Sequence, residues 1–72
     1  MTKAHHTRAM HFELKAQYAW EVVMLEYGKH YADKCFFDGD GRYSRIMRHS
    51  RENPDMTPSE LAKYAIGEFA AS

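Results

Sequence analysis

Four regularly spaced arginines are the residues of this chain whose type and spacing most clearly indicate a binding surface. They are Arg42, Arg45, Arg48 and Arg51. A residue that recurs every third position stays on one half of a helix surface. Guanidinium groups present fixed forks of N–H donors that match carboxylate and phosphate oxygens. The pattern therefore predicts a basic face that contacts an acidic or phosphate-bearing partner, although a solvated face balanced by Glu52 and Asp55 is an equal alternative.

Histidine and cysteine side chains are the next candidates for chemistry. The five histidines are His5, His6, His11, His30 and His49. No two of them stand four residues apart, and no His-Glu-x-x-His motif occurs. The single cysteine, Cys35, cannot form an intramolecular disulfide, and a small thiol beside Phe36 is typical of a buried apolar residue. We therefore expect no catalytic residue, no metal site and no cofactor, and hence a protein that is not an enzyme.

The segment Asp38-Gly39-Asp40-Gly41 begins like a calcium-binding loop but does not continue as one. In an EF-hand numbered from Asp38, the glycine of position six would be Tyr43 and the glutamate of position twelve would be His49. The segment also lacks the Gly-Lys-Ser/Thr ending of a phosphate-binding loop. It is therefore predicted to be a turn.

Composition restricts the remaining function classes. Ten Lys and Arg balance ten Asp and Glu in 72 residues, so net charge does not favour non-specific coating of nucleic acid. A 44% hydrophobic content argues for one small folded domain rather than a disordered chain. No apolar run approaches the ~18 residues of a membrane span, and no apolar segment follows the basic N-terminus. We expect a cytoplasmic protein that does not contact a membrane.

The region from about Ala9 to about Lys34 is predicted to form one long helix, because it lacks proline and consists mostly of good helix formers. Its apolar residues fall on two sides. The Trp20 stripe consists of Phe12, Ala16, Ala19, Trp20, Val23, Tyr27 and Tyr31. The Tyr18 stripe consists of Leu14, Tyr18, Val22 and Leu25. We assign the Trp20 stripe to the core and expect Tyr18 and Leu25 to meet a partner or a second copy of the chain.

Two shorter helices are expected after the Asp38–Gly41 turn. The residues from about Tyr43 to about Arg51 have helical spacing, with a β-hairpin over residues 35–46 as the alternative. Thr57-Pro58-Ser59-Glu60 has the pattern of a capping box with proline at the first helical position. Met56 before this cap and Leu61 after it can form a hydrophobic staple.

These elements predict an all-α fold in which three helices, one long and central, form a single domain over residues 9–72. Residues 1–8 are expected to be a flexible basic arm. The alternative fold is α+β, with the short hairpin over residues 35–46.

The functional expectation is a small non-enzymatic regulator or inhibitor that binds a larger protein with an acidic surface. Such chains are common among virus- and mobile-element-encoded antagonists, an expectation that comes from size alone. The expected partner-binding residues are Arg42, Arg45, Arg48, Arg51, Tyr18 and Leu25. The alternative is a dimeric regulator that contacts nucleic-acid phosphates through the arginines. A homodimer formed through the long helix is a further alternative.

Overall fold

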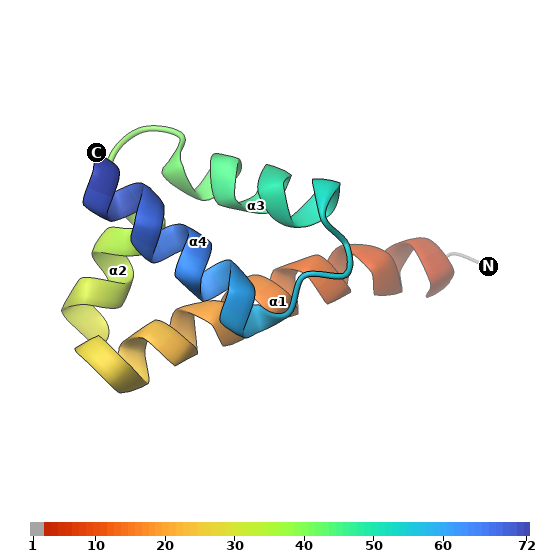
Figure 1. The fold of residues 1–72 in the computed structure, drawn as a ribbon. Coiled ribbons are helices and arrows are strands. Elements are labelled where there is room, and N and C mark those ends of the chain that lie inside the picture. The colour runs from red at the N-terminus through yellow and green to blue at the C-terminus, as the bar shows by residue number, and fades with distance from the viewer. Residues whose placement is uncertain (1–2) are drawn as a thin grey trace.

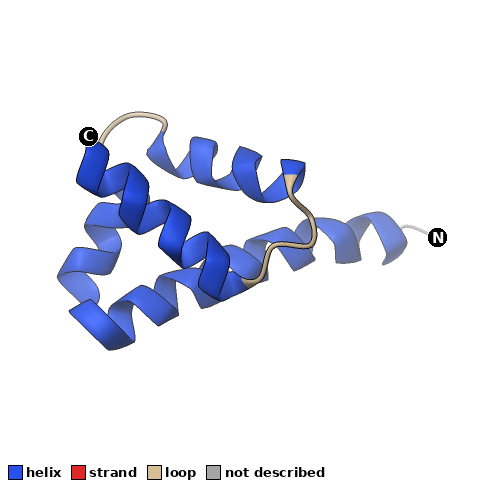
Figure 2. Cartoon of the chain, viewed as in Figure 1, coloured by secondary structure: helices blue, strands red, loops and turns tan. Residues whose placement is uncertain are grey.

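The computed structural model describes the backbone of residues 3–72 and the side chains from residue 11 onward. The helices are α1 (Lys3–Tyr27), α2 (Lys29–Phe37), α3 (Arg42–Glu52) and α4 (Pro58–Ala71). Figure 1 shows α2, α3 and α4 gathered against one part of the longer α1. The all-α prediction is confirmed, since these described residues contain only helices and short connections (Figure 2).

The alternative hairpin over residues 35–46 is wrong. Cys35 lies in the last turns of α2, and Ile46 lies within α3. Between the two helices the chain turns through Gly39 and Gly41, whose φ angles are +84° and +76°. Glycine adopts these positive angles without the steric cost that other residues incur. The turn therefore reverses the chain between two helices rather than between two strands.

The expected single helix from Ala9 to Lys34 is also wrong, because it breaks at Gly28. Gly28 has φ +94° and ψ 161°, a conformation that only glycine readily adopts. Its N–H donates to the carbonyl oxygen of Met24 at 2.8 Å, and its own carbonyl accepts from Ala32 at 3.1 Å. α1 and α2 are therefore separate helices that pack against each other, so the domain has four helices instead of three.

The core lies where α1 meets the other three helices. The Trp20 stripe supplies Ala16, Ala19 and Val23, all almost completely buried. The largest buried side chains opposite them include Phe36 of α2 and Leu61 of α4. Small residues on α1 allow neighbouring helices to approach closely, so the larger side chains can fill the space between them. Assignment of this stripe to the core is confirmed at its centre, while Tyr27 at the end of α1 is more than half exposed.

The predicted capping box of α4 is confirmed. The Thr57 hydroxyl oxygen accepts from the Glu60 N–H at 3.2 Å, and the Thr57 N–H donates to Glu60 Oε1 at 2.8 Å. The hydrogen bond from the Thr57 backbone is the main cause that lowers the pKa of the Glu60 carboxyl. Met56 packs against the core that contains Leu61, as expected for a hydrophobic staple.

The predicted arm overlaps the first turns of α1. Residues 1–2 lie outside the described residues, and α1 already begins at Lys3. In Figure 1 this end of α1 projects beyond the other helices. Mobility of residues 1–8 stays a prediction. Within residues 3–72, no helix combines the length and apolar content that crossing a bilayer requires.

Candidate protein-binding surfaces

The Tyr18 stripe faces away from the core. Leu25 is 81% exposed, Tyr18 is 50% exposed and Leu14 is 43% exposed, while Val22 is partly buried. Large apolar side chains in a row along one helix are a feature of surfaces that receive another helix or chain segment. The two residues expected to contact a partner, Tyr18 and Leu25, are therefore both available at the surface.

One end of the Tyr18 stripe forms a wall of a groove between α1 and the connection that joins α3 to α4. The groove has a volume of about 420 Å³. Its lining residues are His11, Leu14, Lys15, Tyr18, Pro54, Asp55, Met56 and Pro58. Sequence reasoning missed this Tyr18 groove because its two walls lie about forty positions apart in the chain.

Lys15 holds the two walls of the Tyr18 groove together. Its side chain is almost fully buried, and its Nζ donates to the Pro54 carbonyl oxygen at 3.2 Å. The same ammonium lies 5.3 Å from the centre of the Phe12 ring, within the range of a cation–π contact. A helix residue thus fixes the position of the α3–α4 connection, so the groove is a built feature of the fold.

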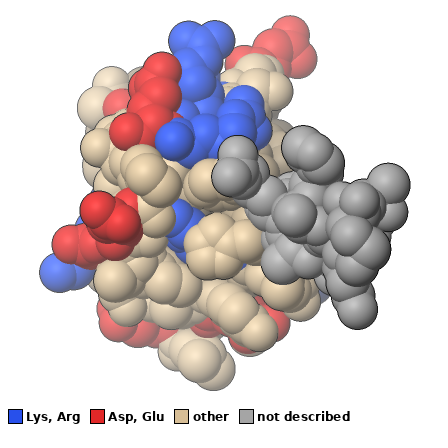
Figure 3. Space-filling model, turned by 90° about the vertical axis from the view of Figure 1, so that its right-hand side faces the viewer, with Lys and Arg blue, Asp and Glu red and all other residues tan. Residues whose placement is uncertain are grey.

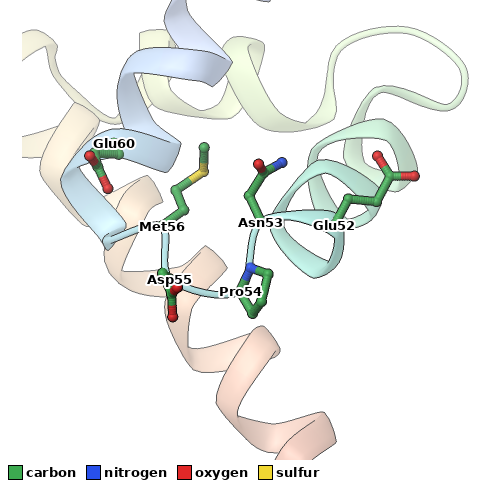
Figure 4. A pocket seen from close by; sticks show the side chains of 6 residues that line it. All are labelled: Glu52, Asn53, Pro54, Asp55, Met56 and Glu60. Carbon is green, nitrogen blue, oxygen red and sulfur yellow. The ribbon is translucent and has the colours of Figure 1, made fainter.

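The α3–α4 connection also borders a second hollow, of about 490 Å³, which Figure 4 shows from close by. In that view the carboxylates of Glu52 and Asp55 point away from each other. The Asn53 side-chain amide donates to the His49 carbonyl at 2.9 Å, and Glu60 is held in the capping box. Asn53 and Glu60 thus bond to the backbone at the two ends of the connection, and the polar groups of this hollow do not converge on a common ligand position.

Arg42 does not belong to the exposed face predicted for the four arginines. It is only 7% exposed, its Nε donates to the Asp38 carbonyl at 2.7 Å, and its guanidinium lies 5.5 Å from the centre of the Phe69 ring. Each step of three residues rotates a side chain by about 60° around a helix. Four such residues therefore span half the circumference, and Arg42 at one end of the span turns toward the core. The prediction that Arg42 lies on the solvent-exposed face is therefore wrong.

The other three arginines form an exposed arginine row on α3, consisting of Arg45, Arg48 and Arg51. Arg45 Nε lies 3.9 Å from Glu68 Oε1 of α4, and Glu52 lies on α3 as well. Figure 3 shows blue Lys and Arg atoms gathered at the upper edge, the height at which α3 lies in Figure 1, with red Asp and Glu atoms beside them. Neighbouring carboxylates therefore offset part of the charge of the row.

Cys35 and His49 are placed as structural residues. Cys35 is completely buried, as predicted, and this burial raises the pKa of its thiol despite the opposing effect of nearby Arg42. The His49 ring stacks on Tyr64 with ring centres 3.7 Å apart. Among the described side chains, no three of His, Cys, Asp and Glu lie close enough together to hold a metal ion.

Comparison of this chain with protein-family models, with curated proteins and with solved structures found no match. The fold and its surfaces define a small all-α domain of four helices.

Proposed function

We propose that this chain is a non-enzymatic protein-binding module that regulates or inhibits a larger protein. The observation that carries the proposal is the Tyr18 stripe, which places Leu25, Tyr18 and Leu14 at the surface while the opposite side of α1 is buried. Aromatic and large apolar side chains that lose contact with water dominate the energetics of protein interfaces. The primary contact is the Tyr18 stripe together with the Tyr18 groove.

A larger protein fits this surface better than a second copy of the chain. Glu21 lies beside the middle of the Tyr18 stripe on the helix surface and is partly exposed. A two-fold pairing of two α1 helices about the middle of the stripe, parallel or antiparallel, brings the two Glu21 carboxylates close together. Like charges at the centre of an apolar interface oppose its formation. A partner of different sequence avoids this repulsion.

The arginine row supplies a second contact, to an acidic surface of the partner. Arg45, Arg48 and Arg51 have exposed side chains on a different helix from the Tyr18 stripe. Arginine forks recognise carboxylates through paired hydrogen bonds. Because Glu68 and Glu52 already lie close by, three cations on this face are too few to hold a nucleic acid strongly at physiological salt. The row therefore favours a protein partner over phosphates.

Position-specific cross-linking tests the primary contact. A photoreactive amino acid at position 18 or 25 is expected to give the same adduct with a larger protein in cells that express the chain. The matched control is position 34, because Lys34 is exposed on α2. An adduct of twice the chain's own mass would assign the stripe to self-association. Equal adducts at position 34, or none at 18 and 25, would refute the proposed surface.

Charge reversal tests the second contact. Arg45→Glu with Arg48→Glu is expected to weaken the adduct formed at position 25 and to leave the helical circular dichroism unchanged, since both side chains are exposed. The wild-type protein at micromolar concentration is expected to shift neither duplex nor single-stranded nucleic acid at physiological salt. A strong shift with a log–log salt slope of about −0.9 per phosphate would instead support nucleic-acid binding.

A further inference from the structure

A second groove, between α1 and α2, has a chemical character different from that of the Tyr18 groove. Its volume is about 350 Å³. Its lining residues are Glu13, Ala16, Gln17, Trp20, Asp33, Phe36, Phe37 and Tyr43. We call it the aromatic groove, because Trp20, Phe37 and Tyr43 bring partly or largely exposed rings to it, while Phe36 is completely buried, and neither lysine nor arginine is among the lining residues.

The aromatic rings of this groove are held in place by their neighbours. Phe37 and Tyr43 stack with ring centres 5.3 Å apart and planes inclined by 21°, so the end of α2 and the start of α3 form one wall. The Trp20 indole N–H donates to Asp33 Oδ1 at 2.9 Å, which fixes the indole against α2. Phe37 nevertheless stays 57% exposed. The groove thus presents ordered aromatic surface to solvent.

The charges in the aromatic groove are negative. Glu13 enters it from α1 and Asp33 from α2. The Asp33 carboxylate is partly neutralised by Lys29, whose Nζ lies 3.3 Å from Oδ2 on the exposed side. The Glu13 side chain is exposed to solvent. A carboxylate at the surface therefore lies in the same groove as the aromatic rings.

We propose that the aromatic groove binds a positively charged organic group, an ammonium or guanidinium, carried by a basic segment of a partner protein. Such cations are attracted to the faces of Trp, Tyr and Phe rings, and recognition of alkylated ammonium groups by several rings is the best-known use of this interaction. The Glu13 carboxylate adds a direct charge partner. The groove selects the opposite charge from that selected by the arginine row. This inference shares with the proposed function the expectation of a protein partner, but it rests on neither the Tyr18 stripe nor the arginine row.

Fluorescence of Trp20 tests the proposal directly, because Trp20 is the only tryptophan in the chain and lines the groove. The probes are short peptides that contain lysine, trimethyllysine or arginine, together with free choline. The neutral control is 3,3-dimethylbutanol, which has the shape of choline without its charge. We expect saturable changes in Trp20 emission with the cationic peptides and affinity about tenfold lower for the neutral control.

Variants connect the response to the groove. Glu13→Gln and Tyr43→Leu are expected to weaken binding of the lysine and arginine peptides, while Glu26→Gln removes an exposed carboxylate elsewhere on α1 and is expected to change nothing. Thermal melts followed by circular dichroism verify that each variant is folded. The chemical shift of the Trp20 indole proton gives a second readout that does not depend on quenching.

Three results would overturn the proposal. The first is the absence of a saturable response in both fluorescence and the indole shift. The second is equal affinity for choline and 3,3-dimethylbutanol, which would make the groove merely apolar. The third is binding of free choline without binding of any peptide, which would assign the site to a small quaternary ammonium compound instead of a protein segment. Leu25→Glu should leave peptide binding intact, so failure of the proposed function is distinguishable from failure of this inference.

Discussion

The two sides of α1 have similar hydrophobic character in the sequence and opposite environments in the fold. Ala19 and Val23 are almost completely buried, whereas Tyr18 and Leu25 are largely exposed. The difference lies in which side of α1 meets the other helices. On the Trp20 stripe, small Ala16 and Ala19 are buried and bulky Phe12 and Trp20 also pack against the core. On the Tyr18 stripe, Leu14, Tyr18 and Leu25 keep much of their surface exposed, which makes them available to another molecule.

The largest expected effect comes from a charge on the covered side. Val23→Glu or Ala19→Glu is expected to unfold the chain, because a buried carboxylate without a partner costs more than the ~3–5 kcal/mol that a core of this size provides. Circular dichroism at 25 °C should show loss of helix.

A matched change on the uncovered side is expected to behave differently. Leu25→Glu or Tyr18→Glu should leave a helical monomer with stability within about 0.5 kcal/mol of wild type. Light scattering at high protein concentration measures the molecular mass and so shows whether the variant is a monomer. A chemical denaturation curve measures its free energy of unfolding. Equal destabilisation by Val23→Glu and Leu25→Glu would contradict the assignment of the two sides.

The same contrast between covered and uncovered side chains exists within the arginines of α3. Arg42→Ala removes a partly buried hydrogen bond to the Asp38 carbonyl and the contact with Phe69, and is expected to cost about 1–3 kcal/mol. Arg48→Ala removes an exposed side chain and is expected to cost less than about 0.5 kcal/mol. Urea denaturation of both variants measures the difference, and an unchanged midpoint for Arg42→Ala would show that its buried contacts do not stabilise the fold.

The sequence predicts local features of this fold better than features set by packing. The cap at Thr57 was predictable because its residues lie within four positions of one another. The division of α1 into two apolar sides was predictable from spacing, and the covered side was assigned correctly. The burial of Arg42 was not, because it depends on Phe69 and on the Asp38 carbonyl, which only the folded chain brings together.

The break at Gly28 and the two grooves are further features that depend on packing and could not be predicted from the sequence. One glycine in a helix-favouring segment is compatible with a continuous helix, and only packing of α2 against α1 selects the bend. The aromatic groove joins Trp20, Phe37 and Tyr43 from three helices, so no short motif indicates it. The partner-binding assignment of the arginine row and the Tyr18 stripe stays a prediction.

Two glycine substitutions test whether the backbone conformation of Gly28 allows α2 to pack against α1. Gly28→Ala is expected to destabilise the fold by about 1–3 kcal/mol, because alanine is strained at φ +94° although space is available for its methyl group. Gly67→Ala, inside α4 and equally unobstructed, is expected to stabilise it by about 0.5–1 kcal/mol. The melting temperature should therefore fall in Gly28→Ala and rise in Gly67→Ala, relative to wild type. A stabilising Gly28→Ala would favour the continuous helix instead.

The last prediction concerns the N-terminal cap of α4, a helix that packs against α1. Thr57→Ala is expected to cost about 0.5–2 kcal/mol, because it leaves the Glu60 N–H without its hydroxyl acceptor. Ser59→Ala, an exposed change two residues later, is the control and should have little effect.

The cap also predicts a pH dependence. The folded pKa of Glu60 lies below its ordinary value of 4.5, so its stabilising contribution is present above pH 4.5 and is lost as the pH falls below that value. Because the main cause, the Thr57 backbone N–H, is retained in Thr57→Ala, the charge is tested with Glu60→Gln: the stability difference between wild type and Glu60→Gln should narrow in acid, and a difference that stays constant down to pH 2 would show that the Glu60 charge does not contribute to the cap.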